Sequence, residues 1–236
     1  PGEGIKITPQ ASTTAEEYFA AYIMEAGLEA LGYEVQDKLI AQVQLSIISV
    51  CNGDSDYYIS LWWPLHKAFW EQGGGDANCQ RIGKMTAGAL QGYLIDKKSS
   101  EAYGITHLDQ FKDPELAKLF DIDGDDKADL YGCESGWGCE RVQVHHMKAY
   151  DLNDTVDIKQ GGYFAIIPDA IERIKAGKPT LYYTWTPLWL SGILRPGHEV
   201  VWLNVPFTSL PDERAKDEDT TVEGLSGLAI AADLTT

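Results

Sequence analysis

The first hundred residues switch between helical and extended hydrophobic patterns. Apolar side chains recur every three or four positions from Tyr18 to Leu31, after the capping box Thr13-Thr14-Ala15-Glu16, in which Thr13 is the expected N-cap. Gly32 follows as a helix-ending residue. Extended segments at 5–8 and 33–35 flank this helix, and such a β–α–β order predicts an α/β protein with parallel strands.

Apolar runs and breaker residues predict the remaining elements. A helix is expected to begin at Pro64 and to stop at the glycines from Gly73, and the polar residues 96–100 are expected to form a turn. The other expected helices span 41–51 (ended by Asn52-Gly53), 105–120 (a short pair), 142–152 and 168–175. The expected strands span 57–63, 87–95, 180–185 and 200–206. We therefore expect a first lobe over 1–98, a second over 99–203, and a return of 204–236 to the first lobe.

One phrase occurs twice, at two expected strand ends. The segment 57–65 contains Tyr-Tyr, a short spacer and Trp62-Trp63-Pro64-Leu65, and the segment 182–188 repeats the pattern around Trp185 and Pro187. A strand that leads large aromatic residues into a proline turn is typical of a cleft rather than of a core. The repeat predicts two similar lobes that face each other.

Charge and hydropathy exclude two classes of partner. The 236 residues carry a formal net charge of -17, which argues against nucleic acid because phosphate binding needs clustered cations. No apolar run is long enough for membrane insertion. The chain opens at Pro1 without a signal peptide, as expected for an exported protein after processing.

The four cysteines leave several chemistries open. Cys133 and Cys139 enclose five residues, a span that suits a disulfide, a zinc site with His145 and His146, or two free thiols. Cys51 and Cys79 are candidates for a second disulfide.

An acidic loop is a candidate calcium site. Asp121, Asp123, Asp125 and Asp129 occupy positions one, three, five and nine of the loop, as oxygen ligands do in compact calcium loops. The EF-hand glycine and the final acid are missing, so the match is to a shorter loop. The alternatives are a structural calcium ion and a solvated acidic turn.

Aromatic and donor residues together predict a zwitterion site. Trp62, Trp137 and Trp185 each lie close to Pro or Gly, and tryptophan faces attract quaternary ammonium groups. The glycine-rich loop around Trp137 is expected to expose that side chain and to form an anion-binding nest of N–H groups, and His66 adds a donor. Stacking on a sugar is the competing use of these tryptophans.

Catalytic motifs are absent, and we predict that the protein is not an enzyme. Nucleophile elbow, metalloprotease, dinucleotide and P-loop motifs do not occur. His145 and His146 are expected on a helix surface. A zinc hydrolase that uses Cys139 and His145 is the remaining enzymatic alternative.

The chain resembles the periplasmic substrate-binding proteins of ProU-type ABC transporters for glycine betaine and proline betaine. The resemblance covers about residues 1 to 211. It rests on the phrases at 62–66, 91–98, 118–121, 136–140, 182–187 and 201–207.

This resemblance implies a two-lobed Venus-flytrap α/β fold with the ligand between the lobes. It implies that Trp62, Trp137 and Trp185 enclose the trimethylammonium group, while His66 and the N–H groups of Gly138 and Cys139 hold the carboxylate. It also implies a Cys133–Cys139 disulfide, an ABC permease as partner, and a monomer in the periplasm that needs no cofactor. Osmoprotectant uptake is the expected role.

The C-terminal segment departs from the family pattern. After about Pro211 the family continues for a long segment, whereas residues 204–236 predict only a shortened return to the first lobe. The alternative functions are binding of another quaternary or sulfonium solute, such as choline or dimethylsulfoniopropionate, and a calcium-dependent carbohydrate-binding module.

Overall fold

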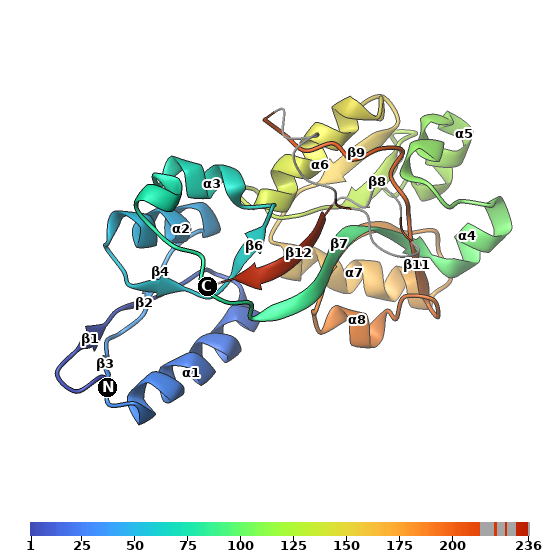
Figure 1. The fold of residues 1–236 in the computed structure, drawn as a ribbon. Coiled ribbons are helices and arrows are strands. Elements are labelled where there is room, and N and C mark those ends of the chain that lie inside the picture. The colour runs from blue at the N-terminus through green and yellow to red at the C-terminus, as the bar shows by residue number, and fades with distance from the viewer. Residues whose placement is uncertain (213–219, 221–224, 226–229, 236) are drawn as a thin grey trace. The chain divides into compact units, whose positions relative to one another are not determined.

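The chain forms two compact units (Figure 1). The computed structural model describes residues 1–212, 220, 225 and 230–235. The first unit comprises Pro1–Gly88 and Gly136–Gly138, together with the C-terminal residues from Ala232 onward. The second comprises Ala89–Ser135 and Cys139–Ala231. No helix in the described part of the chain is both long and apolar enough to cross a membrane.

The first unit is built from short parallel strands and three helices. Strands β1 and β3 pair in parallel, and β2 lies between β4 and β5 with both pairs parallel, as the β–α–β pattern predicts. Strand β6 pairs in antiparallel fashion with the end of β12. The elements are β1 Lys6–Ile7, β2 Pro9–Ala11, α1 Ala15–Ala30, β3 Glu34–Val35, β4 Leu39–Ile40, α2 Val43–Asn52, β5 Tyr57–Tyr58, β6 Leu61–Trp63, α3 Lys67–Gln72, η1 Gly75–Ala77 and β12 Ile230–Thr235.

Glycine ends both long helices of this unit, as predicted. Gly32 follows α1 with φ +93°, and Gly53 follows α2 with φ +78°. Residues other than glycine rarely adopt this left-handed backbone conformation.

The start of α1 differs from the prediction. Thr14, not Thr13, is the N-cap, and its side chain makes no capping hydrogen bond. The carboxylate of Glu17 instead accepts hydrogen bonds from the Ser12 N–H at 3.0 Å and from the Tyr58 hydroxyl at 3.0 Å. A buried tertiary contact therefore replaces the local capping box.

The second unit contains a mixed sheet. Strand β10 pairs with β7 in antiparallel fashion and with β8 in parallel, β9 adds to β8 in parallel, and β11 pairs with β7 in antiparallel fashion. Tyr93, Tyr163, Tyr182 and Tyr183 are fully buried in its core. The elements are β7 Thr86–Asp96, α4 Lys97–Tyr103, η2 Leu108–Lys112, α5 Pro114–Ala117, η3 Lys118–Phe120, β8 Ala128–Tyr131, α6 Gly138–Ala149, β9 Val156–Lys159, α7 Tyr163–Lys175, β10 Leu181–Thr186, α8 Leu190–Ile193 and β11 Val200–Trp202.

The units divide at a different place from the expected boundary at 98/99. The division falls at 88/89, within β7. The expected turn at 96–100 is wrong, because Asp96 caps helix α4 by accepting a hydrogen bond from the Ser99 N–H at 2.8 Å.

The expected return at residue 204 also differs from the structure. Residues 204–212 stay with the second unit because hydrogen bonds hold them there. The Asn204 N–H donates to the Thr106 carbonyl at 2.9 Å, and the Tyr150 hydroxyl donates to the Phe207 carbonyl at 2.6 Å. The highly charged residues 213–219 lie outside the described part of the chain.

Candidate functional site

Trp62 lies in β6, and His66 lies on the turn that connects β6 with α3. Helix α3 begins at Lys67, so the prediction that it starts at Pro64 is wrong. Instead, the Trp63–Pro64 peptide bond is cis, and the His66 N–H donates to the Trp62 carbonyl at 2.8 Å. Both side chains are almost buried, with 9% of Trp62 and 4% of His66 exposed.

Hydrogen bonding fixes which nitrogen of His66 carries the proton. The Trp62 N–H donates to Nδ1 of His66 at 3.1 Å, so Nδ1 is an acceptor and Nε2 carries the ring proton of the neutral form. Burial lowers the pKa of His66 to about 3, so the imidazole is neutral near pH 7. His66 therefore offers one neutral N–H donor, at Nε2.

Gly138 lies directly beside the His66 ring. A Cβ atom at position 138 would be 3.0 Å from Cδ2 of His66 and 2.9 Å from Cγ of Leu65, so a larger residue would force these side chains to move. Cδ2, the ring carbon bonded to Nε2, is therefore the His66 atom nearest to a Cβ at position 138.

Gly138 and Cys139 are the first two residues of helix α6. The sequence predicted this helix from 142 onward and assigned the anion-binding N–H groups to a loop. The first N–H groups of a helix have no intrahelical partner, and the helix dipole adds partial positive charge there. The structure therefore places the predicted N–H groups at a helix N-terminus, a setting that favours an anion.

Trp137 precedes this helix and is buried, with 5% of its surface exposed. The prediction of an exposed tryptophan is therefore wrong. Residues 136–138 belong to the first unit, where the neighbouring Gly138 lies against Leu65 and His66.

Both predicted disulfides are present. Cys133 is bonded to Cys139 and Cys51 to Cys79, with Cα atoms 6.0 and 4.8 Å apart. Bonded cysteines offer no thiolate ligand, so this structure does not support the zinc alternatives that used Cys139 with His145.

Trp185 lies near the end of β10 in the second unit and is supported by two aromatic residues. Its ring centroid is 4.8 Å from that of Tyr163 and 6.4 Å from that of Phe164. The Tyr163 hydroxyl bonds to the Tyr183 carbonyl at 2.9 Å and to Oγ1 of Thr184 at 3.0 Å. Neither residue was predicted from the sequence, although an aromatic pair directly after Gly161-Gly162 was a usable signal.

The predicted site residues are thus distributed over the two units. Trp62, His66, Trp137 and Gly138 belong to the first unit, and Cys139 and Trp185 belong to the second. Within the first unit, Trp62 and Gly138 both lie next to His66, and their common role in one site stays a prediction.

The acidic loop gathers three of its four predicted ligands. One carboxylate oxygen each of Asp121, Asp123 and Asp129 lies within 4.8 Å of the others. Asp125 instead accepts a hydrogen bond from the Lys127 N–H at 3.0 Å. Oxygen ligands of this kind suit calcium, which stays a prediction for this loop.

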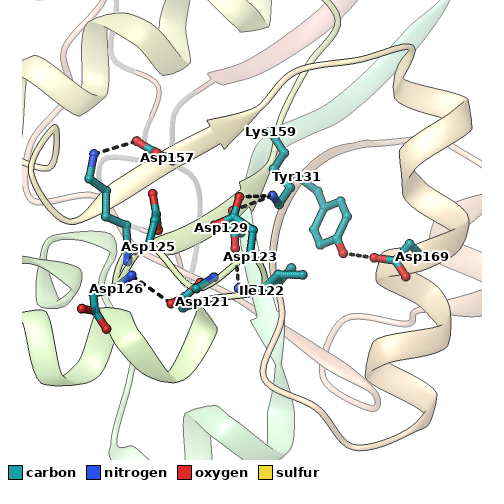
Figure 2. A network of polar contacts seen from close by, with 12 residues as sticks. Asp121, Ile122, Asp123, Asp125, Asp126, Asp129, Tyr131, Asp157, Lys159 and Asp169 are labelled. Carbon is teal, nitrogen blue, oxygen red and sulfur yellow. Dashed lines mark hydrogen bonds and ion pairs between the residues drawn. The ribbon is translucent and has the colours of Figure 1, made fainter.

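The ammonium group of Lys159 lies beside two of these carboxylates (Figure 2). Nζ of Lys159 is 2.9 Å from Asp129 and 3.0 Å from Asp123. Burial alone would lower the pKa of Lys159, but hydrogen bonds and charge from the two aspartates offset this and raise it. The lysine therefore neutralises part of the charge that a calcium ion would neutralise.

Replacing Lys159 is expected to make this loop sensitive to calcium. Lys159→Met removes the cation beside Asp129, which is only 2% exposed, and should lower stability by about 1–3 kcal/mol. Millimolar calcium should then raise the melting temperature of the variant more than that of the unmodified chain. Lys127→Met is the matched control, because Lys127 pairs with the half-exposed Asp157. Equal calcium responses in all three proteins would contradict this expectation.

The prediction that His145 and His146 lie on a helix surface is wrong for His146. His146 is fully buried, and Nε2 lies 2.6 Å from the Ser209 carbonyl, which can only accept. Nδ1 therefore accepts from the Tyr93 hydroxyl at 2.9 Å. Burial is the largest of the effects that lower the pKa of His146 to about 3, so the ring is neutral and holds residue 209 against α6.

Acid is expected to destabilise the chain through His146 and His66. Both histidines resist protonation when folded, so the unfolded chain binds more protons below pH ~6.5, and stability falls as the pH falls from there towards 3. Each histidine contributes about 1.4 kcal/mol per pH unit in that range. Urea unfolding at pH 7 and pH 5 should show a smaller loss for His146→Gln than for the unmodified chain. The same loss in both would show that His146 does not titrate in this way.

Comparisons with known proteins agree on one family. A family model described as the substrate-binding domain of ABC-type glycine betaine transport systems matches residues 5–222. The glycine betaine-binding periplasmic protein OusX of Dickeya dadantii is 50% identical over 220 residues. The glycine betaine/proline betaine-binding periplasmic protein of Salmonella typhimurium is 48% identical over 220 residues. These alignments cover 93% of this chain and 66% of each relative, so the chain spans just under two thirds of their length.

A solved structure shows the fold. Lactococcal OpuAC, in its closed conformation with glycine betaine, matches with a TM-score of 0.69 at 17% identity, over 98% of this chain and 76% of that chain. The predicted two-lobed α/β fold of periplasmic binding proteins is confirmed.

Proposed function

We propose that this chain captures glycine betaine or a related betaine, because it belongs to the family of substrate-binding domains of ABC-type glycine betaine transport systems. In this proposal the protein acts outside the cytoplasm and delivers its ligand to an ABC permease. It binds and releases the ligand without changing it chemically, as the solute-binding character of the family supports.

The observation that carries this proposal is the arrangement of donors around His66. The ring donates from Nε2, and Cδ2, the carbon bonded to Nε2, lies beside Gly138, the first residue of helix α6. A carboxylate placed there would accept from the ring and from the N–H groups of Gly138 and Cys139, and the helix dipole would favour its charge. The local donors would bind this anion despite the negative net charge of the chain.

The tryptophans supply the second half of the proposal. A trimethylammonium group cannot donate hydrogen bonds, and its binding depends on the faces of aromatic rings, which attract it most strongly when it is desolvated. Trp62, Trp137 and Trp185 are each less than a tenth exposed. We assign the cation to these three side chains and the carboxylate to His66, Gly138 and Cys139.

Choline is the first alternative ligand, and the same donors argue against it. Choline has the quaternary ammonium group but lacks the carboxylate, so Nε2 of His66 and the start of α6 would have no anionic partner. Dimethylsulfoniopropionate, which keeps a carboxylate and replaces nitrogen by sulfur, would fit the same donors.

A thermal-shift screen tests the proposed function. Glycine betaine and proline betaine should raise the melting temperature in a concentration-dependent way, because a ligand that binds only the folded state stabilises it by mass action, by about 2.7 kcal/mol at 100 times the Kd. Choline should give a smaller shift. A shift with sugars alone that a chelator abolishes would support the carbohydrate-binding alternative instead.

A further inference from the structure

Phe164 is the residue from which we draw a further inference, and this inference rests on the proposed function. Tyr163 and Phe164 directly follow the Gly161-Gly162 pair, at the start of α7. Backbone hydrogen bonds fix this start, since the N–H groups of Ala165 and Ile166 donate to the Gly162 carbonyl at 2.8 and 3.2 Å. The two rings therefore sit on the first turn of a regular helix rather than on a free loop.

Tyr163 and Phe164 have different relations to Trp185. Tyr163 is fully buried, its ring is tilted by 38° from the indole at 4.8 Å, and its hydroxyl is bonded to β10 at two places. It can hold the indole in place but cannot reach a ligand. Phe164 is half-buried, and its ring stands at 78° to the indole with the centroids 6.4 Å apart.

Two rings that meet at nearly a right angle form a corner. Such a corner presents aromatic surface to a methylated cation from two directions, and a cation is attracted by rings within about 6 Å of their centroids. Trp185 is already one of the residues assigned to the ammonium group, and Phe164 is the partly accessible ring next to it.

We propose that Phe164 is a further cation-contacting residue, which sets the preference for fully methylated ammonium groups, and that Tyr163 is a positioning residue for Trp185. A cation with three methyl groups gains from each additional aromatic wall. A dimethylammonium group still carries an N–H, which prefers a hydrogen-bond acceptor or water to an aromatic wall. Phe164 should therefore add more to the binding of the trimethylated ligand.

The test compares glycine betaine with N,N-dimethylglycine, which share the carboxylate and differ by one methyl group. Isothermal titration should show that Phe164→Leu, which keeps an apolar side chain of similar size, weakens glycine betaine binding by about 3- to 30-fold. The loss for dimethylglycine should be smaller, so the affinity ratio between the two ligands should fall. Phe207→Leu is the matched control, because Phe207 is a half-exposed ring of the same unit that packs edge-on against Tyr150.

The outcomes separate this inference from the proposed function. An unchanged ratio in Phe164→Leu, with affinities within about twofold of the unmodified chain, would overturn the role of Phe164 alone. A lower melting temperature with an unchanged ratio would also overturn it, since a merely structural role predicts that result. No binding of glycine betaine by the unmodified chain would overturn the proposed function and this inference together.

Discussion

Trp185→Ala is expected to weaken glycine betaine binding by about 1–3 kcal/mol, which is roughly 5- to 150-fold in Kd. The indole is 6% exposed and packs against Tyr163 and Phe164, so its loss would remove a desolvated aromatic face from the cation. Cation–π attraction is strongest in such settings because water does not compete for the ammonium group. Isothermal titration calorimetry measures this loss directly.

Two further variants make the Trp185 result interpretable. Trp189→Ala removes a tryptophan of the same unit that is 48% exposed, and it should leave the affinity unchanged. Trp185→Phe keeps an aromatic ring and much of the packing, so it should lose less affinity than the alanine variant. An affinity unchanged in Trp185→Ala, in a protein that still melts cooperatively, would remove Trp185 from the cation site.

His66→Ala is expected to cost glycine betaine about 1.5–3 kcal/mol, the range for a hydrogen bond to a charged group. The reason is that Nε2 is the one ring donor left once Nδ1 accepts from Trp62. Choline has no carboxylate, so its affinity should change much less. The preference for betaine over choline should therefore shrink, and titrations with both ligands measure it.

His66→Gln offers a donor at a similar distance from the backbone and should recover part of the loss. His198→Ala is the control, because His198 is an exposed histidine of the second unit. Equal losses for betaine and choline in His66→Ala would show that His66 supports the fold rather than the carboxylate.

Local sequence signals predicted much of the fold. Gly32 and Gly53 end their helices as expected, because a left-handed residue after a helix needs glycine whatever surrounds it. The repeated Trp-x-Pro-Leu phrase located Trp62 and Trp185 at two strand ends, and the spacing of Cys133 and Cys139 suited the disulfide that the structure contains. Each of these features is decided within a few residues of the chain.

Features that depend on distant residues were not predictable in this way. Glu17 bonds to Tyr58, 41 positions away, and this contact replaces the expected capping box. His146 looks like a surface residue in its helix, but Tyr93 and Ser209 bury it from two other parts of the chain. The apolar stripe of α1 shows the reverse case, since Phe19 is 72% and Tyr22 59% exposed although their spacing is that of a buried face.

The carboxylate half of the candidate site shows the same limit. The sequence predicted Gly138 and Cys139 as donors but not the helix that begins with them, since α6 starts four residues before the predicted position. The tautomer of His66 also depends on the backbone N–H of Trp62, and only the fold brings that group to Nδ1. The assignment of the ring proton to Nε2 is therefore a structural result.

Titration of the unmodified chain with glycine betaine and then with choline, in the same calorimeter and buffer, tests the central claim most directly. The proposed division between a cation site and a carboxylate site predicts one molecule of glycine betaine per chain and an affinity for choline at least about tenfold lower, since choline forgoes a charged hydrogen bond. Equal affinities for the two ligands, or heat from choline alone, would contradict it.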